Sequence, residues 1–142
     1  MVNWNDYVEE KEKENYTFVP EGIYEVTVSD VRRKSQWARP ESFFTVISFE
    51  PIDEGVVPPM FVMSGYKSDN PKTEQFIHYK AVCLTNEIYK AADIDPAGWD
   101  LDDGDPIYDG LSRIIGARLK VLVETNPKTG RAQTVPLVQC RG

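Results

Sequence analysis

Residues 117–131 read Ala-Arg-Leu-Lys-Val-Leu-Val-Glu-Thr-Asn-Pro-Lys-Thr-Gly-Arg, and they indicate the kind of fold that this chain adopts. Over residues 117–125, Leu and Val alternate with charged residues, which is the period of a half-buried strand. Residues 126–130 hold the Asn, Pro and Gly typical of a hairpin loop, with Gly placed for a positive φ angle. We therefore expect residues 131–139 to return as an antiparallel strand.

Three runs upstream of this hairpin predict three further strands. Residues 23–30 alternate apolar and polar side chains, with Tyr24, Val26 and Val28 on one face. Residues 42–50 are rich in aromatic and β-branched residues, and residues 60–66 form a shorter run of the same kind. Between the second and third runs, three prolines and a glycine predict a loop.

One helix is expected between the third and fourth strands. Asn70 is a favourable N-cap, and Pro71 suits the first helical position. Apolar residues then recur at spacings of four and three, which places them on one face of the helix. They are Ile77, Ala81, Leu84, Ile88 and Ala91. Pro96 prevents continuation, so the helix should end near residues 92–95, before an acidic loop over residues 93–110 and a short turn over residues 111–115.

The expected order is therefore strand, strand, strand, helix, strand, strand, in a mainly β (α+β) protein. This order matches the five-stranded OB-fold barrel, although other α+β folds share it. The chain has 142 residues, of which 41% are hydrophobic and 27% charged, as in ordinary globular domains. We expect an acidic N-terminal arm over residues 1–20 and one OB-fold-like domain over residues 21–142.

Location is predicted from what the sequence lacks. No apolar run approaches the length of a membrane span, and the first residues do not resemble a signal peptide. Two widely separated cysteines, Cys83 and Cys140, are more typical of reduced thiols than of a disulfide framework. We expect a cytoplasmic protein that does not associate with membranes.

The net charge of −7 argues against a nucleic-acid partner unless the charges are unevenly distributed. Residues 93–109 hold seven Asp and no Lys or Arg, and residues 1–21 hold six acids and two lysines, which gives −7 and −4. The remaining residues therefore total +4. Because phosphate binding depends on the local field of a groove, the acidic sum does not exclude it.

A basic segment over residues 31–41 surrounds Trp37 and is expected to be the loop between the first two strands. Cations beside a stacking surface are what an unpaired polynucleotide requires. In an OB-fold, strands 2 and 3 and the loops between strands 1–2 and 4–5 form the ligand face. The candidate nucleic-acid-binding residues are Arg32, Arg33, Lys34, Trp37, Arg39, Phe44, Tyr66, Lys67, Lys120, Lys128 and Arg131.

Catalytic and metal-binding signatures are missing from the sequence. Its one histidine, His78, stands in the predicted helix away from any motif, and no phosphate-binding glycine loop or zinc-type spacing is present. The acidic run from Asp100 does not match the calcium-binding EF-hand, because position 12 would be Leu111. We predict no enzyme activity, no metal and no cofactor.

The sequence resembles a family of bacteriophage proteins from replication and recombination modules that are thought to bind single-stranded DNA. The matching segments are residues 20–28, residues 84–92, residues 111–123 and the hairpin over residues 126–131. The resemblance implies an OB-like fold, single-stranded DNA as partner and phage or host replication and recombination proteins as further partners, in an infected bacterial cell. The last residues, Cys140-Arg141-Gly142, differ from the acidic tail through which many such proteins recruit partners.

A second hypothesis is a protein-binding module, for example a phage inhibitor of a host enzyme. It would act through the acidic residues 93–109 or through the N-terminal arm, either of which presents a DNA-like pattern of charge. The choice between DNA and RNA, and the formation of a homo-oligomer, stay open.

Overall fold

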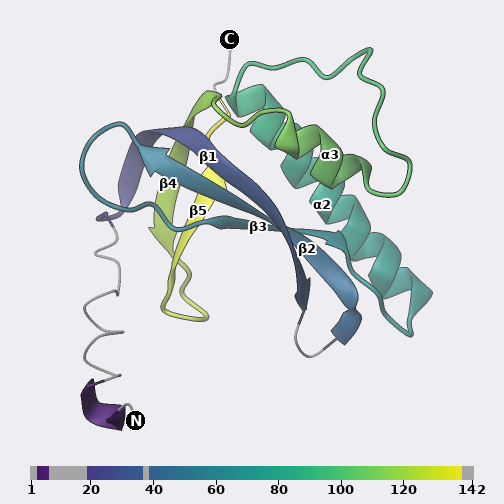
Figure 1. Ribbon diagram of the computed structural model, residues 1–142, viewed down its shortest axis with the longest axis horizontal. Coiled ribbons are helices and arrows are strands. Elements are labelled where there is room, and N and C mark those ends of the chain that lie inside the picture. The colour runs from purple at the N-terminus through teal and green to yellow at the C-terminus, as the bar shows by residue number, and fades with distance from the viewer. Residues whose placement is uncertain (1–2, 7–18, 37–38, 139–142) are drawn as a thin grey trace.

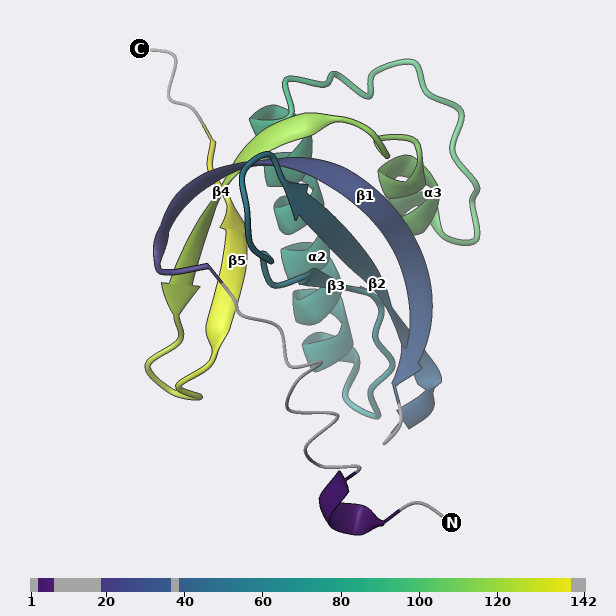
Figure 2. The ribbon, with the colours of Figure 1, turned by 60° about the vertical axis from the view of Figure 1, so that its left-hand side comes forward.

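The protein is described by a computed structural model that covers residues 3–6, 19–36 and 39–138. Its centre is one sheet of five antiparallel strands that curls into a half-barrel (Figures 1 and 2). The strands are β1 (Gly22–Gln36), β2 (Arg39–Pro51), β3 (Met60–Gly65), β4 (Arg118–Thr125) and β5 (Ala132–Pro136), in the spatial order β3-β2-β1-β4-β5. Two helices, α2 (Pro71–Ala91) and α3 (Pro106–Ser112), separate β3 from β4. The mainly β architecture expected from the sequence is confirmed.

Strand β1 curls the sheet because it pairs with two partners in succession. Residues 22–27 pair with β4, and residues 26–36 pair with β2. The register with β2 shifts between Val28 and Asp30, and such a bulge bends a strand and increases its twist. At this bend Val28 exchanges backbone hydrogen bonds of 2.8 and 2.9 Å with Gly116 and Ala117, which lead into β4.

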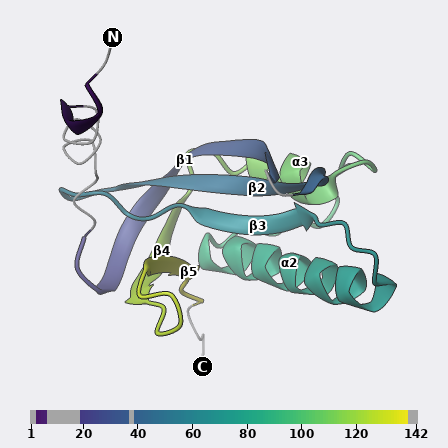
Figure 3. The same cartoon turned by 90° about the horizontal axis from the view of Figure 1, so that it is seen from below.

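The core lies on the inner face of the half-barrel. Val26, Val28 and Val121 are fully buried, as the alternation in the sequence predicts. Helix α2 packs across this face beside β3 (Figure 3) and contributes the fully buried Ile88. The predicted apolar stripe of the helix is therefore the surface that covers the sheet.

Helix α2 begins and ends where the sequence predicts. The Asn70 side chain accepts a hydrogen bond of 3.0 Å from the Lys72 amide, and Pro71 occupies the first turn. At the other end, the Ile94 amide donates to the Tyr89 carbonyl (2.9 Å) and the Asp93 amide to the Lys90 carbonyl (3.1 Å). These two bonds form a Schellman motif, with Asp93 in the left-handed position at φ 57°.

The two edge strands, β3 and β5, approach one another without forming a ladder. Thr134 on β5 is buried, and its hydroxyl donates a 2.6 Å hydrogen bond to the carbonyl of Pro58, two residues ahead of β3. The half-barrel is thus held at its open side by a side chain. Among the described residues, no helix combines the length and the apolar character that crossing a bilayer requires.

Two segments expected to be loops contain regular structure. Strands β1 and β2 continue as a two-stranded ribbon to Gln36 and from Arg39, so most of the expected loop over residues 31–41 is strand. The expected acidic loop over residues 93–110 contains the first five of the seven residues of α3, whose N-cap is Asp105. The last strand is shorter than expected and ends at Pro136.

Candidate nucleic-acid interface

The ribbon formed by β1 and β2 has two faces with different side chains. Val31 is buried and marks the inner face, so alternation places Arg33 on the inner face and Arg32 and Lys34 on the outer face. On β2, the buried Thr45 marks the inner face, which Phe43 shares. Phe44 therefore lies on the outer face.

Cross-strand pairing gathers two cations and two aromatic rings on the outer face. Arg32 pairs with Val46, and Val46 pairs with Phe61 on β3, so these three residues form one row across three strands. Lys34 pairs with Phe44 in the next row. Neighbouring strands are about 4.8 Å apart and rows on one face about 7 Å, so these side chains are neighbours. We call Arg32, Lys34, Phe44 and Phe61 the outer ribbon face.

The two rings of the outer ribbon face contact each other, and the Phe61 ring is exposed to solvent. The Phe44 and Phe61 ring centroids are 5.6 Å apart, with the ring planes at 63°. Phe61 is 54% exposed, whereas Val46 beside it is only 5% exposed. The apolar surface of Phe61 is thus open to solvent and supported by a buried neighbour.

Arg32 and Arg33 make different ion pairs. Arg32 lies 2.9 Å from the Asp30 carboxylate, and both side chains are about half exposed or more, so this pair is weak and readily exchanged. Arg33 reaches inward to the Asp105 carboxylate at 3.1 Å, and its guanidinium lies 3.9 Å from the centroid of the Phe43 ring. The guanidinium of Arg33 therefore faces away from the outer ribbon face.

The other residues predicted to bind nucleic acid are spread over the molecule. Trp37 lies outside the described residues, and of Arg39 only the backbone, at the start of β2, is described. Lys120 is exposed on β4 opposite Glu25. Lys128 and Arg131 are exposed in the β4–β5 hairpin, which lies apart from the end of the β1–β2 ribbon in all three views (Figures 1–3).

Phe61 is a surface residue that sequence reasoning did not select. Its place between Met60 and Val62, both buried, shows that alternation along β3 turns it outward. That signal was present in the sequence. Its proximity to Phe44 and Arg32 depends on the register between strands, which the sequence does not reveal.

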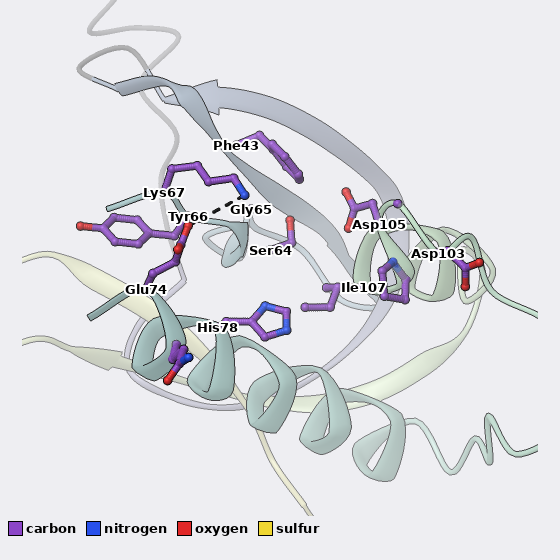
Figure 4. Close-up of a pocket in the computed structure, with 13 residues that line it drawn as sticks. Phe43, Ser64, Gly65, Tyr66, Lys67, Glu74, His78, Asp103, Asp105 and Ile107 are labelled. Carbon is purple, nitrogen blue, oxygen red and sulfur yellow. Dashed lines mark ion pairs between the residues drawn. The ribbon is translucent and has the colours of Figure 1, made fainter. Parts of the chain in front are cut away.

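A pocket of about 440 Å³ lies on the other side of the sheet, between the end of β3, the first half of α2 and residues 103–107 (Figure 4). We call it the β3–α2 pocket. Its lining includes Phe43, Tyr66, Lys67, His78, Asp105 and Ile107. Lys67 makes a long ion pair of 3.9 Å with Glu74, at the side where β3 leads into α2.

Asp105 is the most buried charged residue of this pocket, with 6% exposure. Its Oδ1 accepts a 3.2 Å hydrogen bond from the Tyr108 amide and caps α3. Among the described residues, its Oδ2 accepts no hydrogen bond, although it is ion-paired with Arg33. The ion pair with Arg33 offsets the buried negative charge of Asp105.

Several aspartates of the acidic segment have structural partners. Asp95, Asp102, Asp105 and Asp109 each accept a backbone N–H with a side-chain oxygen, in turns or at the start of α3. Asp109 also pairs with Arg113 at 3.1 Å. Within the described ranges, no three acidic, His or Cys side chains are grouped as a metal site would require. Much of the acidity of residues 93–109 thus stabilises local backbone.

Comparison with known proteins adds no family assignment. No protein-family model matches the sequence, and no curated protein shows significant similarity to it.

Proposed function

We propose that this chain is a non-enzymatic, largely sequence-independent binder of single-stranded DNA with an OB-fold-like barrel. As the family resemblance implies, it would act in phage DNA replication or recombination in the cytoplasm of an infected bacterial cell. The outer ribbon face is the surface to which we assign the strand.

The arrangement of the sheet supports the OB-fold part of the proposal. An OB-fold is a partly open five-stranded Greek-key barrel that binds oligonucleotides on the face of strands 2 and 3. Here β1 lies between β2 and β4, the edges β3 and β5 approach at the open side, and α2 follows β3. The outer ribbon face includes residues of β2 and β3, and strands 2 and 3 are those on which an OB-fold binds its ligands, which supports the assignment.

The observation that carries the proposal is the exposed Phe61 ring, paired with Phe44 and flanked by Arg32 and Lys34. Bases of any sequence stack on aromatic rings, and each stacked base contributes about 1–3 kcal/mol. Cations beside the rings attract the phosphates that connect those bases. In this proposal Phe61 stacks on a base, Phe44 supports it from the edge, and Arg32 and Lys34 contact phosphates.

The experiment is a fluorescence-anisotropy titration of labelled oligo-dT with the wild-type chain and Phe61→Ala. Loss of one stacked base should weaken binding roughly fivefold or more. Because Phe61 is 54% exposed, the substitution should leave the thermal unfolding transition nearly unchanged.

Phe76→Ala on α2 is the matched control. Phe76 is 57% exposed, so the same amount of apolar ring is removed from a different surface. Equal affinities for oligo-dT in the wild type and both variants would contradict the assignment of the strand to the outer ribbon face. No binding of oligo-dT by the wild type would contradict the proposed function itself.

A further inference from the structure

Helix α2 carries an apolar stripe on the side that faces away from the sheet. Tyr79 is 66% exposed and Phe76 57% exposed, and Cys83 continues the stripe one turn further along. Spacings of three and four residues place these side chains in one row, opposite the buried Ala81 and Ile88. In Figure 3 no described element covers this side of α2. Exposed aromatic rings gathered in one patch are typical of a surface that binds a partner.

Two charges of opposite sign stand at the ends of this stripe. Lys72 lies one turn before Phe76, Glu87 lies one turn after Cys83, and both are exposed. Among the described residues, neither makes an ion pair. Lys72 also lies in the first turn of α2, where the helix dipole disfavours a cation. We call Lys72, Phe76, Tyr79, Cys83 and Glu87 the outer α2 face.

The outer α2 face is complementary to itself when two copies of the helix lie antiparallel. A twofold axis midway along the apolar stripe crosses the helix between residues 79 and 80 and places Phe76 opposite Cys83 of the second copy. The two Tyr79 rings then lie beside the axis. The same register places Lys72 opposite Glu87 of the second copy, and the symmetry repeats this pair. The position of the axis follows from the apolar residues alone, so the pairing of the charges is an independent agreement.

We propose that this chain self-associates through the outer α2 face, with α2 helices from two copies packed antiparallel. The contact from Lys72 to Glu87 is only about 22 Å long, which is small for a protein interface, so the dimer should be weak. A nucleic acid along the same stripe would meet the repulsion of Glu87, whereas a second copy offers this carboxylate a lysine. The inference does not depend on the proposed function, because α2 lies on the other side of the sheet from the outer ribbon face (Figure 3).

Sedimentation velocity of the full chain without nucleic acid tests the proposal. Reducing conditions exclude disulfide-linked pairs, and a salt concentration of about 0.15 M limits the repulsion between two chains of charge −7. We expect the sedimentation coefficient to rise toward that of a dimer as the protein concentration increases from about 1 μM to about 1 mM. A chain that stays monomeric throughout this range would overturn the proposal.

Removal of both exposed rings should weaken self-association. Phe76→Ala/Tyr79→Ala should raise the dimer dissociation constant by about tenfold or more, because aromatic residues contribute most to small interfaces. Both positions are exposed, so the thermal unfolding transition should be nearly unchanged. Phe61→Ala, which removes a 54% exposed ring from the outer ribbon face, is the matched control and should leave the dissociation constant unchanged. Equal dissociation constants for the double variant and the control would overturn the proposal.

An exchange of charges tests the antiparallel register. Lys72→Glu and Glu87→Lys should each weaken self-association by about fivefold, because each replaces two ion pairs by two contacts between like charges. Lys72→Glu/Glu87→Lys restores both pairs in reverse and should recover the wild-type dissociation constant. A parallel arrangement of the helices would place each position opposite itself and give no recovery. Failure of the double variant to recover would therefore overturn the proposed register.

A titration with oligo-dT distinguishes a second copy from a bound strand. With an oligonucleotide short enough for one chain, Phe76→Ala/Tyr79→Ala should bind as tightly as the wild type. A weaker affinity in this variant would mean that the outer α2 face holds a strand instead of a second copy, and would overturn the proposal.

Discussion

Arg32 and Arg33 show how one step along a strand decides what a residue contacts. The two side chains carry the same group, but alternation sends Arg32 to the outer face and Arg33 toward the buried Asp105. Sequence reasoning grouped them as one cationic cluster because it placed them in a loop, where no alternation applies. Only a side chain that stays in solvent keeps its full charge available for phosphate.

Tyr89 and Gly110 form a close contact that can be tested by substitution. A Cβ atom on Gly110 would overlap the Tyr89 hydroxyl, and Tyr89 is only 6% exposed and cannot easily move. In a helix Ala is normally favoured over Gly by about 1 kcal/mol. Here overpacking, which costs about 1–3 kcal/mol, should exceed that gain. We predict that Gly110→Ala lowers the free energy of unfolding, measured by urea denaturation.

The same substitution at Gly110 in a Tyr89→Phe variant tests whether the Tyr89 hydroxyl causes the loss of stability. Without the hydroxyl, the nearest ring atom lies 3.4 Å from the new Cβ, so Gly110→Ala should become neutral or stabilising. Burial raises the pKa of the Tyr89 phenol, with Arg113 opposing the shift and Asp109 adding to it. The hydroxyl is therefore neutral in both folded and unfolded chains at pH 7. The effect of Gly110→Ala should be measured at this pH in the wild-type and the Tyr89→Phe backgrounds. The same cost in both backgrounds would show that the hydroxyl is not what excludes a side chain at position 110.

Helix α2 and the β1–β2 ribbon mark the limits of sequence reasoning at the level of elements. The helix was predictable because its cap, its apolar period and its end are all local signals. The ribbon was not predictable. Residues 32–36 extend beyond the core and are polar, and their side chains are exposed where described. Because neither face of this segment is buried, its sequence lacks the alternation of apolar and polar residues that indicates a strand. Their strand conformation comes from pairing with β2, a contact between segments that the sequence alone does not specify.

The ribbon is joined to α3 by the Arg33–Asp105 pair, and its two partners should respond differently to substitution. Arg33→Gln leaves the Asp105 carboxylate, which is only 6% exposed, without its cation. Because Arg33 itself is 46% exposed and solvent weakens the pair, we expect the free energy of unfolding to fall by only about 1–2 kcal/mol. Asp105→Asn leaves a half-exposed guanidinium that water can solvate, so its cost should stay below about 1 kcal/mol. Urea unfolding at pH 7 measures both.

The double variant Arg33→Gln/Asp105→Asn completes the cycle. It removes the buried charge together with its partner, so it should recover most of the stability lost in Arg33→Gln. Equal losses for the two single variants would mean that the pair acts as a surface ion pair and does not anchor the ribbon.

At the scale of the whole molecule, the sequence predicted the elements better than the site. Arg32, Lys34 and Phe44 were selected from it, and the structure brings these three together. Phe61 and the β3–α2 pocket were missed because both arise from juxtaposition: the first from the register of β2 with β3, the second from α2 and residues 103–107 meeting the end of β3. Lys128 and Arg131 were selected because the loop between strands 4 and 5 frames the ligand face of an OB-fold, and Lys120 because it lies on the outer face of the fourth strand.

The net charge of −7 leads to a prediction about salt that separates local from global electrostatics. For single strands, the logarithm of affinity falls with the logarithm of salt concentration by about 0.7 for each phosphate neutralised. Replacing Arg32 and Lys34 by Gln should therefore reduce the slope for oligo-dT by about 1.4. The measurement is a set of anisotropy titrations between about 50 and 200 mM salt, a range in which such slopes are resolved.

The informative control raises the charge elsewhere. Glu87→Lys and Asp100→Lys together change the net charge by +4, from −7 to −3, at exposed positions on α2 and in the acidic segment. Because the Debye length is about 8–10 Å at 0.1–0.15 M salt, these distant charges should leave the slope unchanged. If the control steepens the slope as much as the Arg32 and Lys34 substitutions flatten it, the strand responds to the total charge of the protein, and the outer ribbon face is not where its phosphates bind.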